Sequence, residues 1–384
     1  MSFITKKAAI VGIHEYQSRR APGVTTQQIQ MECAKGALED AGLKKDDVDA
    51  YFTAALSPVE ALVTAEYLGI RPTYIDSTCI GGPSFITHVG HAVIAIAAGV
   101  CKVALITYGS TALSDMISIG TGGPLPPMGG PNSFELPYGQ TVVGCYALAA
   151  QRHAYEFGST DAQRAEISVA TRKWASLNAH AMFRKPLTIN EVLNSRMIST
   201  PLRFLECCVI SDGGGAVVVT SSDRARNLRR QPVYLLGWGE ALGHGTVMNQ
   251  MRDFTDNGAS ISGSKAFEMA GLKPEDIDIA QIYDSFTITV MLSLEGLGFC
   301  PKGEGGHFVS VQRTAPGGDF PMNTDGGGLS SNHPGMRGIF LIIEAVRQLR
   351  GECGARQVPN AKLALAHGTG VFLSSSATAI LSNE

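Results

Sequence analysis

A single cysteine, Cys79, stands between a run of residues typical of a strand and one typical of a helix, in the stretch STCIGGPSF. A thiol just before a helix is a candidate nucleophile, because the helix dipole and the free N–H groups favour the thiolate. Gly81 and Gly82 would let the backbone approach a ligand closely and offer N–H groups to an oxyanion. The alternative is a small buried residue at a tight turn, and the spacing alone leaves both interpretations open.

A histidine occupies a similar position later in the chain. His333 follows the glycine-rich stretch NTDGGGLSSN and precedes Pro334, which we expect at the first position of another helix. A lone histidine is often only structural. A cysteine and a histidine in matching loops, however, would form an activated nucleophile for acyl transfer.

Two more loops carry groups that could move protons. The expected strand at 277–283 ends in Tyr283, which could donate a proton to a carbonyl, and is followed by Asp284 and Ser285. The alternative is that Tyr283 packs and that one of its two neighbours caps the next helix. His367 precedes a Gly-Thr-Gly turn between two apolar runs, a turn that hairpins also contain.

An α/β framework must position these loops, because short β-rich runs alternate with helical runs along the chain. The segment ALEDAGLKKDDVDAYFT at 37–53 reappears from residue 266 as AFEMAGLKPEDIDIAQIYDSF, at a constant offset. We therefore predict a duplicated fold, with one half at 1–111 plus 205–230 and the other at 231–384. Residues 112–204, rich in proline and glycine at their start, are expected to form an inserted loop domain that shapes a pocket, with Met116, Met128 and Phe134 in an apolar wall.

Composition excludes several classes of protein. The 384 residues carry a net charge of −3, which offers no electrostatic basis for binding nucleic acid or an anionic membrane. No apolar run reaches the roughly 20 residues of a membrane span, and no secretory signal is recognisable, so we expect a cytoplasmic protein. The eight cysteines lack the spacing of a metal site and are expected to be reduced. Cys207 and Cys208 are expected in a buried strand.

In this order the motifs resemble the thiolase superfamily, specifically the sterol-carrier-protein-x type and the lipid-transfer-protein-like branch. The resemblance covers essentially the whole chain. It rests on Cys79 before a glycine-rich helix start, YDSF at 283–286, NTDGGGLSSNHP at 323–334 and the terminal HGTGVFLSSSATAIL. It implies duplicated βαβαβαββ halves packed as a five-layer αβαβα sandwich, with a loop domain inserted in the first half.

The resemblance also implies roles for residues. Cys79 would accept the acyl group and His333 would activate it. Both usual sources of a second catalytic cysteine are missing, because Ser285 stands in one loop and His367 follows Ala366 in the other. Tyr283 and His367 are then the candidates for the second acid or base. The residues expected to bind substrate are Asp284, Ser285, Gly328, Gly368 and Gly370.

The expected function is that of a thiolase-like acyltransferase of lipid metabolism, which makes or cleaves a carbon–carbon bond in a β-ketoacyl-CoA through a Cys79 acyl-enzyme. One alternative is a retro-aldolase that acts on a β-hydroxyacyl-CoA with Tyr283 and His333. Another is a non-catalytic thiolase-like subunit of a complex. The resemblance further implies coenzyme A thioesters as substrates, no permanently bound cofactor or metal, a homodimer, and a small zinc-ribbon/OB-fold partner protein.

Overall fold

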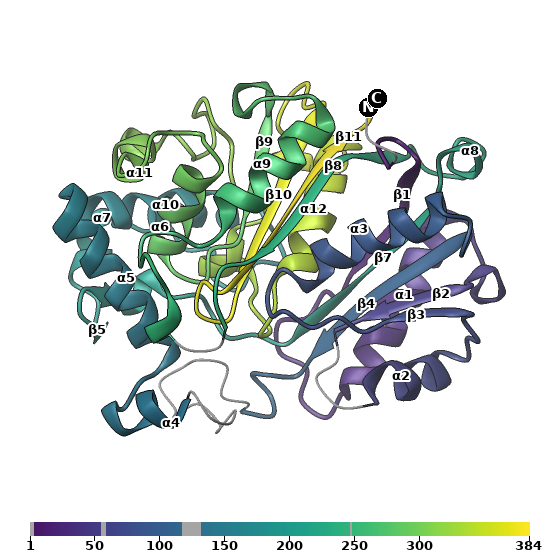
Figure 1. Cartoon of the computed structure of the whole chain (residues 1–384), viewed down its shortest axis with the longest axis horizontal. Coiled ribbons are helices and arrows are strands. Elements are labelled where there is room, and N and C mark those ends of the chain that lie inside the picture. Colours follow the sequence, from purple (N-terminus) through teal and green to yellow (C-terminus); the bar gives the residue numbers. More distant parts are fainter. Residues whose placement is uncertain (1–3, 55–58, 117–131, 246–247) are drawn as a thin grey trace.

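The computed structural model describes residues 4–54, 59–116, 132–245 and 248–384. One nine-stranded mixed sheet runs through these residues, in the order β3-β2-β4-β7-β1-β8-β11-β10-β9 (Figure 1). Its strands are β1 (Ala8–Glu15), β2 (Ala50–Thr53), β3 (Tyr74–Asp76), β4 (Val103–Ser110), β7 (Gly213–Ser221), β8 (Val233–Leu242), β9 (Ile279–Ile282), β10 (Leu363–Gly370) and β11 (Ser375–Ser382). A separate pair is formed by β5 (Met197–Ser199) and β6 (Leu202–Arg203).

The sheet consists of two halves that meet at a narrow junction. Strands β3, β2, β4, β7 and β1 come from the first part of the chain, and β8, β11, β10 and β9 come from the last part. Between the halves, β1 and β8 pair only at Ala9 with Tyr234 and at Ile10 with Val233. The two halves can therefore bend away from each other and leave room for helices between them.

Equivalent elements recur at the offset seen in the sequence. Helix α1 (Thr26–Ala41) ends at Gly42 and helix α9 (Ala259–Ala270) ends at Gly271, and both glycines adopt the left-handed conformation. One residue before β2, Asp49 accepts hydrogen bonds from the backbone at the start of β4, and Asp278, one residue before β9, does the same at the start of β10. The predicted duplication therefore extends to individual hydrogen bonds.

Helix-to-strand packing is duplicated as well. A Cβ atom on Gly12 of β1 would lie 2.0 Å from the carbonyl oxygen of Ala37 in α1. A Cβ atom on Gly237 of β8 would lie 2.0 Å from the carbonyl oxygen of Ala266 in α9. In each half, a glycine thus lets the outer helix lie directly on the sheet.

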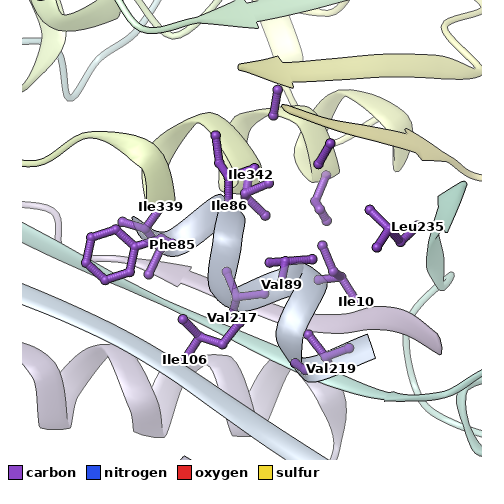
Figure 2. Close-up of a cluster of buried hydrophobic side chains, with 14 of the residues drawn as sticks. Ile10, Phe85, Ile86, Val89, Ile106, Val217, Val219, Leu235, Ile339 and Ile342 are labelled. Carbon is purple, nitrogen blue, oxygen red and sulfur yellow. The ribbon is translucent and has the colours of Figure 1, made fainter. Parts of the chain in front are cut away.

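Two helices fill the space between the sheet halves. These are α3 (Ser84–Ala97) and α12 (Gly338–Leu349), whose apolar side chains share one buried cluster with residues from both halves (Figure 2). Phe85 and Ile86 of α3 lie near Ile339 and Ile342 of α12 in this cluster. The outer faces are covered by α1 and α2 (Glu60–Leu68) on one half and by α9 and α10 (Thr287–Gly296) on the other. The result is the expected helix–sheet–helix–sheet–helix order.

The described part of the chain between β4 and β7 contains α4 (Asn132–Glu135), α5 (Val142–Phe157), α6 (Asp161–Ser176) and α7 (Ile189–Leu193). Helices α5 and α6 pack beside the second half, against α10 (Figure 1). Helix α6 begins after Thr160, whose side chain accepts a hydrogen bond from the Gln163 N–H. Two short helices, α8 (Ser222–Ala225) and α11 (Gly305–Phe308), lie elsewhere in the chain. None of the described helices has the length and apolar composition needed to cross a membrane.

One local prediction is wrong. Cys207 and Cys208 do not belong to a strand, because they lie between a 3₁₀ turn at Phe204–Glu206 and β7, which begins at Gly213. Cys207 instead forms an isolated bridge with Phe286, and Cys208 donates its backbone N–H to the carbonyl of Ser285. The apolar character of this stretch reflects burial against the YDSF loop.

Candidate active site

A cavity of about 250 Å³ opens where the two central helices begin. Loops from both sheet halves and the start of α5 line this cavity. The lining residues are Gly81, Gly82, Val142, Val143, Tyr146, Cys207, Cys208, Tyr283, Ser285, Phe286, His333, Gly335, Met336, Thr369, Gly370 and Val371. Four loops that the sequence singled out therefore meet at one place.

Tyr283 and His333 form a hydrogen-bonded pair inside the cavity. The Tyr283 hydroxyl lies 2.9 Å from His333 Nε2, and the two rings meet edge to face. Both side chains are more than nine-tenths buried. Gly82 makes room for the pair, because a Cβ atom there would lie 2.5 Å from Cε2 of Tyr283. The structure thus brings together two predicted residues that are 50 positions apart.

Both members of this pair are neutral near pH 7. Burial, and then the positive charge of Arg337, lower the pKa of His333 to about 4, so the imidazole is an unprotonated base. Burial raises the pKa of Tyr283 well above its usual value, so the phenol keeps its proton. His333 Nδ1 is buried and has no hydrogen-bond partner among the described residues. The Tyr283 oxygen can therefore accept a proton from a ligand while the phenolic proton passes to His333 Nε2 along their hydrogen bond.

The segment after His333 is not helical, contrary to the prediction for Pro334. The Tyr108 hydroxyl donates to the carbonyl of Pro334 at 2.5 Å and accepts from the N–H of Met336 at 3.0 Å. Helix α12 begins only at Gly338, four residues after the proline. Tyr108, which belongs to the other sheet half, thus holds this segment open as a wall of the cavity.

Cys79 matches His333 in position along the chain but not in environment. Each lies five residues before the first residue of its helix, Ser84 in α3 and Gly338 in α12. Cys79 is exposed, however, and does not line the cavity. The thiol therefore lies outside the cavity that contains Tyr283 and His333.

His367 lies in the interior of the sheet. Its side chain is fully buried, and Nδ1 is 2.9 Å from the Thr378 hydroxyl of the neighbouring strand. Burial lowers the pKa of His367 to about 3. Only its backbone serves the site, since its carbonyl accepts the N–H of Tyr283. Pairing within the sheet thus turns the imidazole of this predicted catalytic residue away from the cavity.

The residues expected to bind substrate divide into two groups. Ser285 and Gly370 line the cavity. Gly368 does not line it; its missing side chain leaves room for Pro83, whose Cα would lie 2.9 Å from a Cβ atom at this position. Gly368 therefore allows the residue before α3, Pro83, to pack closely on β10.

Asp284 and Gly328 lie beneath the cavity and support its loops. The Asp284 carboxylate accepts hydrogen bonds from the N–H groups of Gly328 at 2.6 Å and Leu329 at 3.1 Å. Arg337 Nε is 3.5 Å from the same carboxylate. Burial raises the pKa of Asp284 to about 6, although Arg337 and the two N–H groups oppose this effect. Asp284 thus joins the Tyr283 loop to the loop that leads to His333.

Buried charges that sequence reasoning missed hold the same loops. Arg337 forms two 2.6 Å hydrogen bonds with the carboxylate of Asp325. Glu15 accepts hydrogen bonds from Asn332 and from Arg347. These partners are far apart in the sequence, and no local spacing pattern identifies them. Their common effect is to fix the backbone on both sides of His333.

Comparison with known proteins identifies the family. Residues 239–383 match the family model described as "Thiolase C-terminal domain-like". An acetyl-CoA acetyltransferase of Methanothermobacter thermautotrophicus is 33% identical over 95% of this chain and 96% of its own length. The chain belongs to the thiolase superfamily. The sterol carrier protein 2 of Bos taurus is 32% identical over 62% of this chain and 45% of its own length, which is consistent with the expected branch.

A solved structure extends the likeness within the thiolase superfamily. The structure titled "Ltp2-ChsH2(DUF35) aldolase" is 31% identical to this chain and has a TM-score of 0.88. The alignment covers 99% of this chain and 98% of that one. The relatives of this chain therefore include proteins with aldolase names as well as acetyltransferase names.

A second cavity, of about 370 Å³, adjoins the first in this thiolase-family chain. The two cavities share Val143, Cys207 and Cys208 in their linings. Residues of the expected loop domain form much of the second wall, including Met182, Phe183, Ile198, Arg172 and Arg196. The guanidinium groups of Arg172 and Arg196 lie over the rings of Phe183 and Phe204, at 5.5 and 5.8 Å. The wall is thus apolar with two cations.

The apolar wall differs from the one expected at the start of the inserted segment. Met116 and Phe134 are exposed and line neither cavity. Met128 lies outside the described residues. Among the residues that the structure describes, no group of three or more histidine, cysteine or acidic side chains is placed to hold a metal ion.

Proposed function

We propose that this chain catalyses coenzyme A-dependent carbon–carbon bond chemistry, and that it cleaves a β-hydroxyacyl-CoA by a retro-aldol reaction. The observation that carries this proposal is the buried Tyr283–His333 pair, 2.9 Å apart in a cavity that Cys79 does not line. A retro-aldol cleavage needs proton transfers but no covalent acyl-enzyme. This reverses the order in which the sequence alone ranked the two reactions.

The pair fits the first half of such a reaction. Tyr283 would take the proton of the substrate β-hydroxyl while its own phenolic proton passes to His333 Nε2. The bond between Cα and Cβ then breaks, Cβ becomes a carbonyl, and the electron pair moves to Cα as the enolate of the departing thioester. The low pKa of His333, about 4, keeps the imidazole ready to accept this proton at neutral pH.

A second candidate is thiolysis of a β-ketoacyl-CoA with Cys79 as nucleophile. The position of Cys79, five residues before α3, favours it, because His333 occupies the matching place before α12. The similarity to an acetyl-CoA acetyltransferase also supports thiolysis as the reaction. This candidate requires that the exposed thiol reach the cavity, which it does not line in this structure.

The adjoining cavities support a coenzyme A thioester as substrate. A ligand with its thioester beside Tyr283 would extend its coenzyme A portion into the second cavity, where Arg172 and Arg196 could attract phosphate groups. The segment 112–204 would then act as the proposed loop domain between the halves 1–111 plus 205–230 and 231–384. The eight free cysteines agree with a cytoplasmic location.

A partner subunit and a homodimer belong to the same proposal. The name of the aldolase neighbour joins two proteins, Ltp2 and ChsH2(DUF35), and we propose a small partner of comparable role for this chain. The expected zinc-ribbon/OB-fold protein would bind near the substrate entrance. Lipid-derived acyl groups suit the apolar part of the first cavity, which Val142, Val143 and Phe286 line.

The deciding experiment compares Cys79→Ala with Tyr283→Phe on a panel of β-hydroxyacyl-CoA thioesters and on acetoacetyl-CoA with free coenzyme A. We expect Cys79→Ala to keep near-normal retro-aldol cleavage and Tyr283→Phe to lose it. Abolished turnover in Cys79→Ala would instead establish the thiolase reading. If the unmodified protein turns over none of these substrates, with or without its partner, the result supports the alternative that the chain is a non-catalytic subunit of a complex. Cys300→Ala serves as the thiol control, because Cys300 lines neither cavity.

A further inference from the structure

Breaking the Cα–Cβ bond leaves an electron pair on Cα, and the enolate must then receive a proton. The Tyr283–His333 pair is engaged with the hydroxyl oxygen at Cβ during this step. A second acid is therefore required, and it must face the cavity on the side where the thioester lies.

Most polar groups in the cavity wall are already engaged. The Tyr146 hydroxyl donates to the carbonyl of Val371 at 3.1 Å, and the Ser285 hydroxyl is 3.0 Å from that of Thr289. The Cys207 thiol donates to the carbonyl of Arg203 at 3.3 Å. Thr369 has no partner for its hydroxyl among the described residues, but an aliphatic hydroxyl is a much weaker acid than a thiol.

Cys208 is held at the junction of the two cavities. Its backbone N–H donates to the carbonyl of Ser285 at 2.9 Å, and the next N–H, of Val209, donates to the carbonyl of Gly328 at 2.9 Å. The segment therefore bridges the loop that carries Tyr283 and the loop that leads to His333. Cys208 lines both cavities, so a thioester that extends from one into the other passes beside it.

Cys208 and Tyr283 line the same cavity. After burial, the charge of an ionised Cys208 is the largest cause of the raised pKa of Tyr283, since two anions would then share the cavity. Burial likewise raises the pKa of Cys208 itself. The thiol thus keeps its proton between turnovers and is suited to act as an acid toward a strong carbon base.

We propose that Cys208 is the acid that protonates Cα of the departing acyl-CoA, an inference that rests on the proposed carbon–carbon bond cleavage. The S–H bond breaks, its proton forms the new Cα–H bond, and the electron pair stays on sulfur as thiolate. The proton stored on His333 then returns through Tyr283 to the Cys208 sulfur. Every group is back in its starting state, and no oxidant or cofactor is consumed. In the synthetic direction the Cys208 thiolate removes the α-proton.

The step can be measured without bond cleavage. The full-length protein is incubated with propionyl-CoA in D₂O, and the exchange of the α-protons is followed by mass spectrometry. General acid–base catalysis typically contributes about 10²- to 10⁴-fold, so we expect Cys208→Ala to slow exchange by at least about 100-fold. Cys300→Ala is the matched control, because Cys300 is another half-buried thiol whose pKa burial also raises, to about 12. It should exchange at the rate of the unmodified protein.

Two readouts separate this inference from the proposed function. If the unmodified protein cleaves its substrates but Cys208→Ala exchanges and cleaves within about threefold of it, Cys208 is not the acid and the proposed function survives. If the unmodified protein neither cleaves nor exchanges, the proposed function fails and this inference falls with it. Thermal unfolding checks the fold of Cys208→Ala. Should that variant unfold, Cys208→Ser keeps the volume while removing the acidic thiol, and unimpaired exchange by it would also overturn the proposal.

Discussion

The backbone N–H of Gly338 donates to the carbonyl oxygen of Gly82 at 3.0 Å, which ties the start of one central helix to the start of the other. The contact is close, because a Cβ atom on Gly338 would lie 2.4 Å from that oxygen. The loops before the two helices carry Cys79 and His333. Together with the Tyr108 hydrogen bonds to Pro334 and Met336, this contact joins the two halves at the cavity.

Replacing Gly338 with alanine should damage activity more than stability. The added methyl group must push the Gly82 carbonyl away, which costs about 1–3 kcal/mol of unfolding free energy for an overpacked site. A shift of the helix start by about 1 Å would lower kcat about 100-fold. Chemical denaturation and turnover measure the two effects. Gly243→Ala is the control, since its nearest neighbour would be 3.8 Å away, and equal behaviour of the two variants would refute the prediction.

Tyr283→Phe should retain the fold and lose catalysis. The ring still packs against Gly82, but the phenolic oxygen that links substrate to His333 is gone. We expect kcat for β-hydroxyacyl-CoA cleavage to fall by about 10²- to 10⁴-fold. Tyr51→Phe removes another buried hydroxyl, one that pairs with Thr107 at 2.7 Å away from the cavity, and should leave kcat unchanged. Near-normal turnover by Tyr283→Phe would exclude the relay.

The pH profile of kcat/KM should have its acidic limb near pH 4 and not near 6.5. Burial and Arg337 lower the pKa of His333, so the unprotonated base is fully present above about pH 5 and is lost only as the pH falls through about 4. The unfolded chain has the ordinary pKa, so His333 also makes folding less favourable as pH falls from about 6.5 toward 4. A limb near pH 6.5 would contradict a buried, neutral His333. Asp284 has a pKa of about 6, so its titration could also produce an acidic limb near pH 6. The profile of Asp284→Asn identifies this case, because the limb would then be absent.

Asp284→Ala should destabilise the protein strongly. It leaves the N–H groups of Gly328 and Leu329 unpaired in the interior and removes a negative charge beside Arg337. Breaking a buried pair in this way costs about 3–5 kcal/mol, which denaturant melts can resolve. Asp284→Asn keeps an acceptor oxygen and should cost less. As a control, Asp223 is an exposed acid, and Asp223→Ala should change stability by no more than about 0.5 kcal/mol.

Much of the framework could be predicted because it depends on short-range patterns. The repeat of Ala41-Gly42-Leu43-Lys44 as Ala270-Gly271-Leu272-Lys273 marks a helix, its left-handed glycine end and the following strand in both halves. Cys79 and His333 fall in matching loops for the same reason. The family followed from the order of these motifs, which a linear sequence preserves.

Tertiary packing alone decided which of these residues share a cavity. Tyr283 and His333 meet because Gly82, which has no side chain, leaves room for the Tyr283 ring. The sheet partner Thr378 binds the His367 imidazole inside the sheet, and Cys79 is exposed and does not line the cavity. Cys208 reaches the site through backbone bonds to loops about 80 and 120 residues away. Spacing along the chain indicated most elements and the glycine ends of α1 and α9, but not the start of α12 at Gly338. Burial and side-chain access depend on contacts between distant segments, which no local pattern records.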